Sequence, residues 1–491
     1  MLVPLAIPPG LFRNGTEYGS KARWRDASLV RWVEGIMRPI GGWEARVSVG
    51  ASIPSRAALA WSDLSGTSRI ALGQHSKLYA VLAAGTVTDI TPVGLTAGNL
   101  DAVIKVGYGN STFGTGYYGT PRPDVGTYSE ATTWALDTFG QELLACSVSD
   151  GRIFKWDLNV INDGVALAGA PVNNVSMMVT DERFVFALGA AGNRRKVQWS
   201  DRENATSWTP AATNQAGDQD LQTSGQIMCG IRVRGQALIL TDIDAHAATY
   251  IGPPFVYGFE RVGSSCGPVS RKALASVDAG AFWMGQRGFF VYSGGAVTEI
   301  PCDVADYVFP GLSIAQASKT YAVANAQFSE IWWFYTSSGS NENDRYVTYN
   351  YKDNIWSFGN LARSCGVDRG VFRTPIWFGT TGQGYNHETG LNFDGMPVFC
   401  ESGPIELGNG DNVMQVNSLI PDELTQGDVT ATFKAKYYPN DTERTYGPYS
   451  TRNPTSVRFT GRQFKLRVDG ARLADFRVGT LRVEVKIGGL R

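Results

Sequence analysis

The sequence predicts an all-β protein, with a β-propeller body of about six or seven blades, an N-terminal arm and a C-terminal β-sandwich-like module. Three observations predict this fold class. Short runs of alternating apolar and polar residues, typical of strands, recur along the chain, whereas apolar residues at helical spacing are sparse. A unit of roughly 40 residues repeats from Ser68 onward. The repeat is absent from the first 50 residues and from the last stretch of the chain.

The composition is that of a globular protein rich in glycine and aromatic residues. The 491 residues are 43% hydrophobic and 18% charged, and include 57 Gly, 23 Phe, 20 Tyr and 13 Trp. These values exclude disordered, collagen-like and multi-span membrane classes. No run reaches the ~18 to 20 apolar residues of a membrane helix. Residues 1–12 hold three prolines and no basic n-region, so no secretory signal is expected.

Each repeated unit contains a short apolar strand, a turn with Gly or Asn/Asp, a second strand carrying aromatic residues, and another glycine turn. A meander of about four such strands cannot bury its aromatic face alone, so neighbouring units must stack, and radial stacking gives a β-propeller. The period is too long for a β-helix, and no Pro/Ser-rich linkers separate the units as a string of sandwiches would require. The units span 69–92, 132–159, 176–208, 226–262, 273–309 and 321–358, with a weaker seventh from 371 to about 416.

Three segments follow from this repeat. Residues 1–50 form an arm for docking and assembly, 51–423 form the propeller body, and 424–491 form a basic β module. In that module, 464–468 and 481–487 alternate apolar with charged residues. Successive strand residues point to opposite faces, so a small sandwich or a sheet packed on the propeller would bury the apolar face.

A loop rich in glycine and tyrosine is expected at 107–123, inside the first part of the body. It contains Tyr108, Tyr117 and Tyr118, and Pro121 and Pro123 lie near its end. Its Gly-x-Gly sequence follows no βαβ pattern, so dinucleotide binding is not predicted. The loop would project from a blade and could stack on a partner, with a plain surface loop as the alternative.

Charge is divided unevenly along the chain, although the formal net charge is only −1. Lys/Arg against Asp/Glu is 7 to 4 in residues 1–46, 24 to 36 in 47–433 and 13 to 5 in 434–491. A negative body with positive ends suits an assembly in which the basic module of one subunit meets the acidic face of another. A solvated surface is the alternative. Arg outnumbers Lys 32 to 12, which favours ordered interfaces.

No catalytic site, metal site or cofactor is predicted. No Gly-x-Ser-x-Gly elbow, phosphate loop, Cys-x-x-Cys or His-Glu-x-x-His occurs. The histidines are isolated at His75, His246 and His387. The cysteines are expected to be reduced core thiols of a protein folded in a cytoplasm. They are Cys146, Cys229, Cys266, Cys302, Cys365 and Cys400.

Acidic residues leave one enzymatic alternative open. Residues 200–208 loosely resemble the Asp-box turn of sialidase propellers, although the glycine is absent and the spacing differs. That turn is structural even where it is genuine. Glycoside hydrolysis needs two carboxylates roughly 5 to 9.5 Å apart. The pairs Asp218/Asp220 and Asp242/Asp244 are better explained as solvated surface.

Both ends of the chain resemble one family. The opening segments are similar to the N-terminus of tail nozzle proteins of short-tailed bacteriophages, also described as tail-hub or packaged-DNA stabilisation proteins. Those segments are 7–16 (IPPGLFRNGT), 22–32 (ARWRDASLVRW) and 38–43 (RPIGGW). The C-terminal signature of the family resembles 461–468 (GRQFKLRV), 474–479 (ADFRVG) and 488–489, and 118–122 (YGTPR) also matches.

The resemblance implies a structural virion protein of the phage tail without enzymatic activity. Members of the tail nozzle family have a propeller body and assemble as a ring of six below the portal and adaptor proteins. The ring's lumen conducts double-stranded genomic DNA during ejection and retains it after packaging. The ring forms in the host cytoplasm, and tail fibre or tail needle proteins are further expected partners. An acidic body would make a lumen wall that repels the phosphate backbone.

By this analogy, the arm would pack on the adaptor ring or the adjacent subunit, and the basic module would dock on neighbours. Aromatic residues and arginine make good interface anchors. The expected interface residues are Arg13, Trp24, Arg31, Arg38, Trp43, Arg462, Lys465, Arg467 and Arg482. Alternatively, the tryptophans fill the arm's own core. A propeller enzyme or a binding protein acting on host surface glycans is the alternative function.

Overall fold

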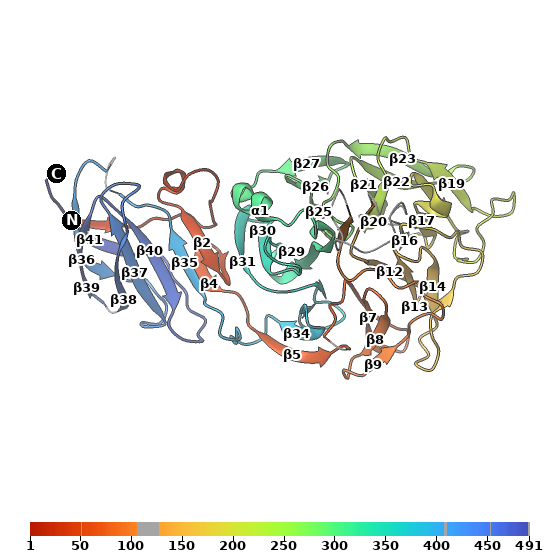
Figure 1. Ribbon diagram of the computed structural model, residues 1–491, viewed down its shortest axis with the longest axis horizontal. Helices are drawn as coiled ribbons and strands as arrows, with labels where there is room; N and C mark the ends of the chain where they lie inside the picture. The colour runs from red at the N-terminus through yellow and green to blue at the C-terminus, as the bar shows by residue number, and fades with distance from the viewer. Residues whose placement is uncertain (51, 106–126, 407–409, 452, 490–491) are drawn as a thin grey trace, which may run out of the picture.

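The computed structural model describes residues 1–491 apart from 51, 106–126, 407–409, 452 and 490–491. It is an all-β protein, with a β-propeller at one end of the long axis and a two-sheeted β-sandwich at the other (Figure 1). The predicted fold class is confirmed. None of the helices in the described ranges could cross a membrane. They are α1 (Ala305–Gly311), η1 (Tyr18–Ser20), η2 (Ala190–Gly192), η3 (Ala317–Lys319) and η4 (Ala326–Phe328).

The propeller has seven blades, each an antiparallel four-stranded sheet. Blade 1 contains β6 (Ala57–Ser62), β7 (Ser68–Gly73), β8 (Leu78–Leu82) and β9 (Val87–Asp89). Blade 2 contains β12 (Trp134–Phe139), β13 (Glu142–Ser147), β14 (Ile153–Trp156) and β15 (Val165–Ala166). Blade 3 contains β16 (Ser176–Val179), β17 (Val185–Leu188), β18 (Lys196–Trp199) and β19 (Gly217–Asp220).

The next three blades are also meanders of consecutive strands. Blade 4 contains β20 (Ile227–Val233), β21 (Gln236–Thr241), β22 (Ala245–Gly252) and β23 (Val256–Gly263). Blade 5 contains β24 (Leu274–Val277), β25 (Gly280–Met284), β26 (Phe289–Ser293) and β27 (Ala296–Ile300). Blade 6 contains β28 (Tyr321–Asn325), β29 (Glu330–Tyr335), β30 (Arg345–Asn350) and β31 (Ile355–Asn360). The first six predicted units therefore fall in blades 1 to 6, although 69–92 omits β6, 132–159 omits β15 and 176–208 omits β19.

Blade 7 is completed by a strand from the other end of the chain. Its first three strands are β32 (Cys365–Val367), β33 (Ile376–Phe378) and β34 (Gln383–His387), and its fourth is β5 (Trp43–Ser48). The predicted arm, 1–50, and the predicted seventh unit, 371–416, both differ from this arrangement. Local alternation carries no information about a partner strand so distant in sequence, which is why the boundaries were misplaced.

The innermost strands close the ring. In order, β6, β12, β16, β20, β24, β28 and β32 each contact the next, and β32 contacts β6. Each blade is buried on both faces, which explains the continuous apolar runs. On β29, Trp332 packs against Trp377 of blade 7, with ring centroids 5.0 Å apart, while Trp333 packs against Phe289 of blade 5 at 4.8 Å. Adjacent tryptophans thus face opposite blades, because strand side chains alternate.

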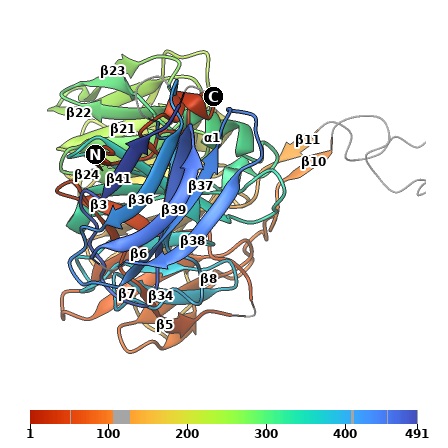
Figure 2. The ribbon, with the colours of Figure 1, turned by 90° about the vertical axis from the view of Figure 1, so that its left-hand side faces the viewer.

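A hairpin leaves the propeller between blades 1 and 2. Its strands are β10 (Val103–Lys105) and β11 (Thr127–Ser129), and Figure 2 shows them extending away from the body. Lys319 of η3 fixes the chain just before β10 through an ion pair with Asp101 at 2.5 Å. The predicted loop 107–123, with Tyr108, Tyr117 and Tyr118, lies outside the described residues.

The sandwich consists of two sheets. One has the order β1 (Leu2–Pro4), β41 (Arg482–Ile487), β36 (Met414–Ile420) and β39 (Thr455–Gly461). The other has the order β2 (Trp24–Ser28), β35 (Phe399–Ser402), β40 (Gln463–Gly470), β37 (Val429–Lys436) and β38 (Arg444–Ser450). The buried residues of β40 and β41 alternate with less buried charged ones, as the sequence pattern predicted.

Residues 1–50 are divided between both parts of the molecule and do not form a separate arm. β1 pairs with β41 and β2 pairs with β35, so the first strands belong to the sandwich. A hairpin of β3 (Val30–Val33) and β4 (Ile36–Pro39) follows, and Met37 pairs with Val478. The sandwich therefore begins before the propeller and resumes after it, which also moves its second boundary from 424 back to about the residues before β35.

The sandwich and propeller share a hydrophobic core. β2 lies beside β31, the outermost strand of blade 6. One continuous cluster includes Leu11 and Trp24 from the N-terminal segment, Trp356 from blade 6, and Phe433 from the sandwich. The Leu11 N–H donates to the Trp356 carbonyl at 2.9 Å. The two parts are therefore joined by apolar packing as well as by the chain.

Folding also reduces the charge contrast. Residues 391–433 hold seven acidic and no basic residues, and they lie mostly in the sandwich with the basic C-terminus. Residues 1–42 and 391–491 together carry 19 Lys/Arg and 15 Asp/Glu, a net of +4, whereas 43–390 carry 25 and 30, a net of −5. The opposite signs persist, but the −12 and +8 of the sequence segments do not describe the folded parts.

Candidate functional site

Both tryptophans of the predicted interface are buried within the chain. Trp24 on β2 is 6% exposed and Trp43 on β5 is 2% exposed. The indole N–H of Trp43 donates to Asp394 at 2.6 Å, and its ring lies 5.5 Å from the ring of His387. These side chains hold the N-terminal strands onto the sandwich and blade 7. The alternative prediction placed them in the arm's own core, but Trp24 and Trp43 lie in two separate clusters shared with the sandwich and blade 7.

Arg31 forms a buried ion-pair network. Its guanidinium contacts both oxygens of Glu388, at 2.9 and 2.6 Å, and Glu330 at 3.0 Å. It also lies 3.7 Å from the centroid of the Phe328 ring. Burial opposes the charged form of Arg31, but the two carboxylates outweigh it and raise the pKa of the guanidinium. The network joins β3 to blades 6 and 7.

The other two arginines predicted as interface residues in the N-terminal segment are also engaged inside the chain. Arg13 pairs with Asp26 at 3.1 Å and lies 4.2 Å from the centroid of the Tyr307 ring on α1. Arg38 pairs with Asp475 at 3.5 Å, across the junction between β4 and the C-terminal segment. Neither contact requires a second chain.

Three of the four cations predicted in the C-terminal module have partners within the sandwich. Lys465 pairs with Glu17 and Glu443. Arg467 pairs with Asp469 at 2.8 Å, and Arg462 lies 5.3 Å from the centroid of the Tyr438 ring. Arg482 differs: it is exposed on β41, and its side chain forms no ion pair with any described residue.

Arg482 belongs to a cationic sheet face, which we define as Arg458, Arg482 and Lys486 on the outer side of the four-stranded sheet. All three are exposed, and none has an ion-pair partner among the described residues. Glu484 lies between Arg482 and Lys486 and accepts a hydrogen bond from Ser418 at 2.9 Å. This sheet lies at the end of the molecule farthest from the propeller (Figure 1). The face can therefore meet an acidic partner without obstruction from its own chain.

The acidic pairs that suggested hydrolysis lie in structural settings. In the turn at 200–208, the Asp201 N–H donates to the Ser207 carbonyl at 2.7 Å, and Trp208 is buried. Asp218 pairs with Lys196 at 2.8 Å on the outer strands of blade 3. Asp244 is buried and accepts from the hydroxyl of Thr223 at 3.0 Å.

The cysteines are free thiols, and Cys302 is the one that is not fully buried. Burial raises the pKa of Cys146, Cys229 and Cys365 to about 12, so these thiols are held protonated. No group of three His, Cys, Asp or Glu side chains among the described residues could hold a metal ion. Reduction in a cytoplasm remains a prediction.

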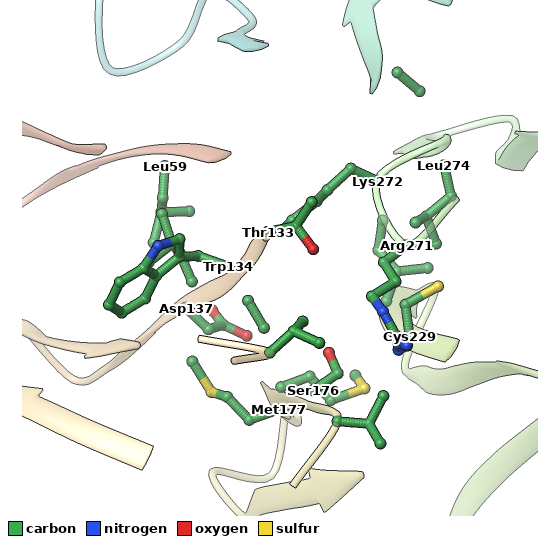
Figure 3. Close-up of a pocket in the computed structure, with 18 of the residues that line it drawn as sticks. Leu59, Thr133, Trp134, Asp137, Ser176, Met177, Cys229, Arg271, Lys272 and Leu274 are labelled. Atoms are coloured by element: carbon green, nitrogen blue, oxygen red, sulfur yellow. The ribbon is translucent and has the colours of Figure 1, made fainter. Parts of the chain in front are cut away.

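A pocket of about 340 Å³ lies within the ring of innermost strands (Figure 3). Residues from six blades line it. One from each is Leu59, Trp134, Met177, Ile231, Leu274 and Tyr321. These side chains narrow the centre of the propeller to a small cavity, which we call the channel pocket.

The channel pocket also contains charged groups that sequence reasoning missed. Asp137 on β12 pairs with Arg232 on β20 at 2.8 Å, and burial raises the pKa of its carboxyl. Arg271 and Lys272 stand just before β24, and both belong to the lining. The one sequence feature that could have marked them is a pair of adjacent cations directly before the apolar start of the predicted unit 273–309.

The fold and these surfaces define a seven-bladed β-propeller protein with a β-sandwich fused to blade 6. No protein-family model matches the chain, and no curated protein matches it. Virginiamycin B lyase from Staphylococcus aureus is similar in structure, with a TM-score of 0.43, 10% identity, and coverage of 70% of this chain and 98% of that one.

Two further solved structures show a similar level of likeness. A streptogramin B lyase has a TM-score of 0.43 and 13% identity, and covers 70% of this chain and 98% of its own. BamB from Moraxella catarrhalis has a TM-score of 0.39 and 12% identity, covering 73% of this chain and 93% of its own. At these identities and TM-scores, the activities of those proteins carry no conclusion for this chain.

Proposed function

We propose that this chain is a structural protein of a short-tailed bacteriophage tail. It would form a ring-shaped nozzle or hub, below portal and adaptor proteins, that conducts and retains the packaged genome. The observation that carries the proposal is the meeting of the two ends of the chain. The segments that resemble the family begin at residue 7 and resume at 461, and they pair in one sandwich through β2, β35 and β40.

The narrow centre of the propeller supports an assembly of several copies. The channel pocket, at about 340 Å³, is lined by side chains from six blades. A DNA duplex is wider than its ~12 Å major groove, and side chains from six blades enclose the channel pocket, so we do not assign the conduit to the centre of one propeller. A genome conduit would therefore be the space enclosed by several copies, as in the ring that the family resemblance implies.

The cationic sheet face is the surface best suited to a partner. Most of the predicted interface residues are already neutralised or buried within the chain. Of that set, Arg482 is exposed and has no ion-pair partner among the described residues, and Arg458 and Lys486 share its face. The propeller carries a net charge of −5 and the sandwich +4. Charges of opposite sign favour docking of the sandwich on an acidic surface, and they set the orientation in which the sandwich docks. The acidic surface would belong to a neighbouring copy or to the adaptor.

The enzymatic alternative has less support from the channel pocket. Of its lining residues, Asp137 is the one carboxylate, and Arg232 already pairs with it. Glycoside hydrolysis needs two carboxylates that act together. A polysaccharide-release assay on intact host cells would revive the enzyme hypothesis if the purified protein gave turnover.

Charge reversal at the cationic sheet face tests the proposal. We expect the wild type to form a ring in native mass spectrometry, alone or with its adaptor, and we expect Arg458→Glu/Arg482→Glu/Lys486→Glu to form none. The matched control reverses three exposed cations of blade 3, Arg194, Arg195 and Arg202, and should still assemble. A wild-type chain that stays monomeric even with the adaptor would contradict the proposed function. Unchanged assembly in the triple variant would show that the cationic sheet face is not the assembly interface, and it would leave the proposed function standing.

A further inference from the structure

The channel pocket holds a cation that no described residue neutralises. Arg232 pairs with Asp137 at 2.8 Å, and Arg271 pairs with Glu130 at 3.1 Å. Lys272 also lines the pocket, but its amine has neither a hydrogen bond nor an ion pair with any described residue. A partly buried ammonium group without a partner loses hydration and gains nothing in return. Such a group favours an anion.

The backbone fixes Lys272 at the seam between blades 5 and 6. Its N–H donates to the Ser270 hydroxyl at 3.3 Å, and its carbonyl accepts from the Ala322 N–H at 2.7 Å. Lys272 also forms an isolated parallel bridge with Tyr321, the first residue of β28. The position of the side chain is therefore set by two blades, and it does not depend on a flexible loop.

The one carboxylate that lines the pocket, Asp137, is already paired with Arg232. Burial lowers the pKa of Lys272, while Cys229, Cys365 and the paired Asp137 raise it less. Figure 3 shows Lys272 and Arg271 entering the pocket from one side, with Thr133 and Asp137 on the other. Thr133 and Ser176 line the same space and carry hydroxyl groups that can donate to an anion.

We infer that the channel pocket binds the oxyanion group of a small molecule, a carboxylate or a phosphate, on the amine of Lys272. The hydroxyls of Thr133 and Ser176 would supply further hydrogen bonds. The volume of about 340 Å³ is at the lower end of the roughly 300–1,000 Å³ of ligand pockets, so the ligand is small. Met177 and Leu274 provide an apolar wall for its carbon part. This site does not depend on the proposed function of the chain.

Anion binding to the full chain tests the inference. Inorganic phosphate and acetate are the two probes, each compared with chloride at equal ionic strength, and binding is followed by calorimetric titration and by Tm. We expect at least one probe to bind the wild type saturably and to raise its Tm by about 2 °C or more at saturation. Binding of phosphate alone would assign a phosphate ligand, and binding of acetate alone a carboxylate.

Two variants and a control separate a site from general salt effects. Lys272→Met should weaken the Kd of the bound probe at least about tenfold, whereas Lys272→Arg keeps the cation and should retain binding. Lys352→Met removes an exposed lysine of blade 6 and should change nothing. The inference is overturned if neither anion binds the wild type more than chloride does, or if Lys272→Met binds as tightly. If Lys272→Met does not fold, the Lys272→Arg variant decides the question. Loss of anion binding in a folded Lys272→Arg would overturn the inference, because that variant keeps the cation.

Discussion

The propeller and the sandwich are both made of antiparallel strands, but they are connected in opposite ways. Blades 1 to 6 pair strands that follow one another in the chain. The sandwich pairs the first strand, β1, with the last, β41, and places β2 beside β35. Blades 1 to 6 are therefore specified by local patterns, whereas blade 7 and the sandwich pair strands from opposite ends of the chain. The predictions below test how far the two parts depend on each other.

The largest effect on the free energy of unfolding is expected at Arg31, which joins the N-terminal segment to blades 6 and 7. Arg31→Met leaves Glu330 and Glu388 buried without their cation, and burial already raises the pKa of Glu330. Breaking a buried ion pair this way costs about 3–5 kcal/mol of unfolding free energy. Chemical denaturation measures it. Arg482→Met is the control, and equal midpoints for the two variants would contradict the network.

The next effect tests whether the two parts unfold together. Phe433→Ala removes a fully buried ring from the sandwich and should cost about 3–5 kcal/mol. Eleven of the 13 tryptophans lie in residues 43–390, so tryptophan fluorescence reports mainly on the propeller. Because the core is continuous across the junction, we expect the fluorescence midpoint to shift with the variant. An unmoved fluorescence midpoint would mean that the propeller unfolds on its own.

A local turn of blade 1 should give a smaller, pH-dependent effect. Asp63 accepts hydrogen bonds from Ser65 and Thr67 and pairs with Arg69 at 2.9 Å. The Ser65 hydrogen bond is the largest of the causes that lower its pKa, from 3.8 to about 2.

This lowered pKa fixes the sign of the effect. The carboxylate stabilises the fold above pH 3.8, and its contribution falls away as the pH drops toward 2. In acid denaturation series, Asp63→Asn should be less stable than wild type at pH 7, and the difference should shrink below pH 4. A constant difference across that range would contradict this explanation.

The smallest effect on stability is expected at the cationic sheet face. Arg458, Arg482 and Lys486 are exposed and have no ion-pair partner among the described residues. Reversing all three to Glu should leave the unfolding midpoint almost unchanged, since surface substitutions usually stay within about 0.5 kcal/mol. Differential scanning calorimetry checks this. A large loss of stability would show that the face supports the fold itself, and the assembly experiment would then need single variants.

The fold was predictable where pairing is local. The runs EIWWFYTS and DRYVTYNYKDNIWSF identified blade 6 because their alternation and turns lie within one short segment. The seventh blade was not predictable in this way, because its strand β34 pairs with β5 from the other end of the chain. The arm and the module were separated at residues 50 and 424 for the same reason.

The candidate sites were less predictable, because a side chain's partner cannot be inferred from its type. Arg31 and Arg482 are both arginines on short strands, yet one is 3% exposed between two carboxylates and the other faces solvent. Their sequence contexts give no reason to separate them. Lys272 was missed because cations beside an apolar strand, such as the pair Arg271 and Lys272, are usually solvated, and only closure of the propeller places Lys272 at the centre.

The most direct test of the central claim is electron microscopy of the purified chain mixed with its adaptor ring. The account predicts closed rings whose propellers surround a lumen wide enough for duplex DNA, with the sandwich of each copy contacting a neighbouring copy or the adaptor. Single propeller-and-sandwich particles, unattached to the adaptor at any ratio of the two proteins, would contradict it.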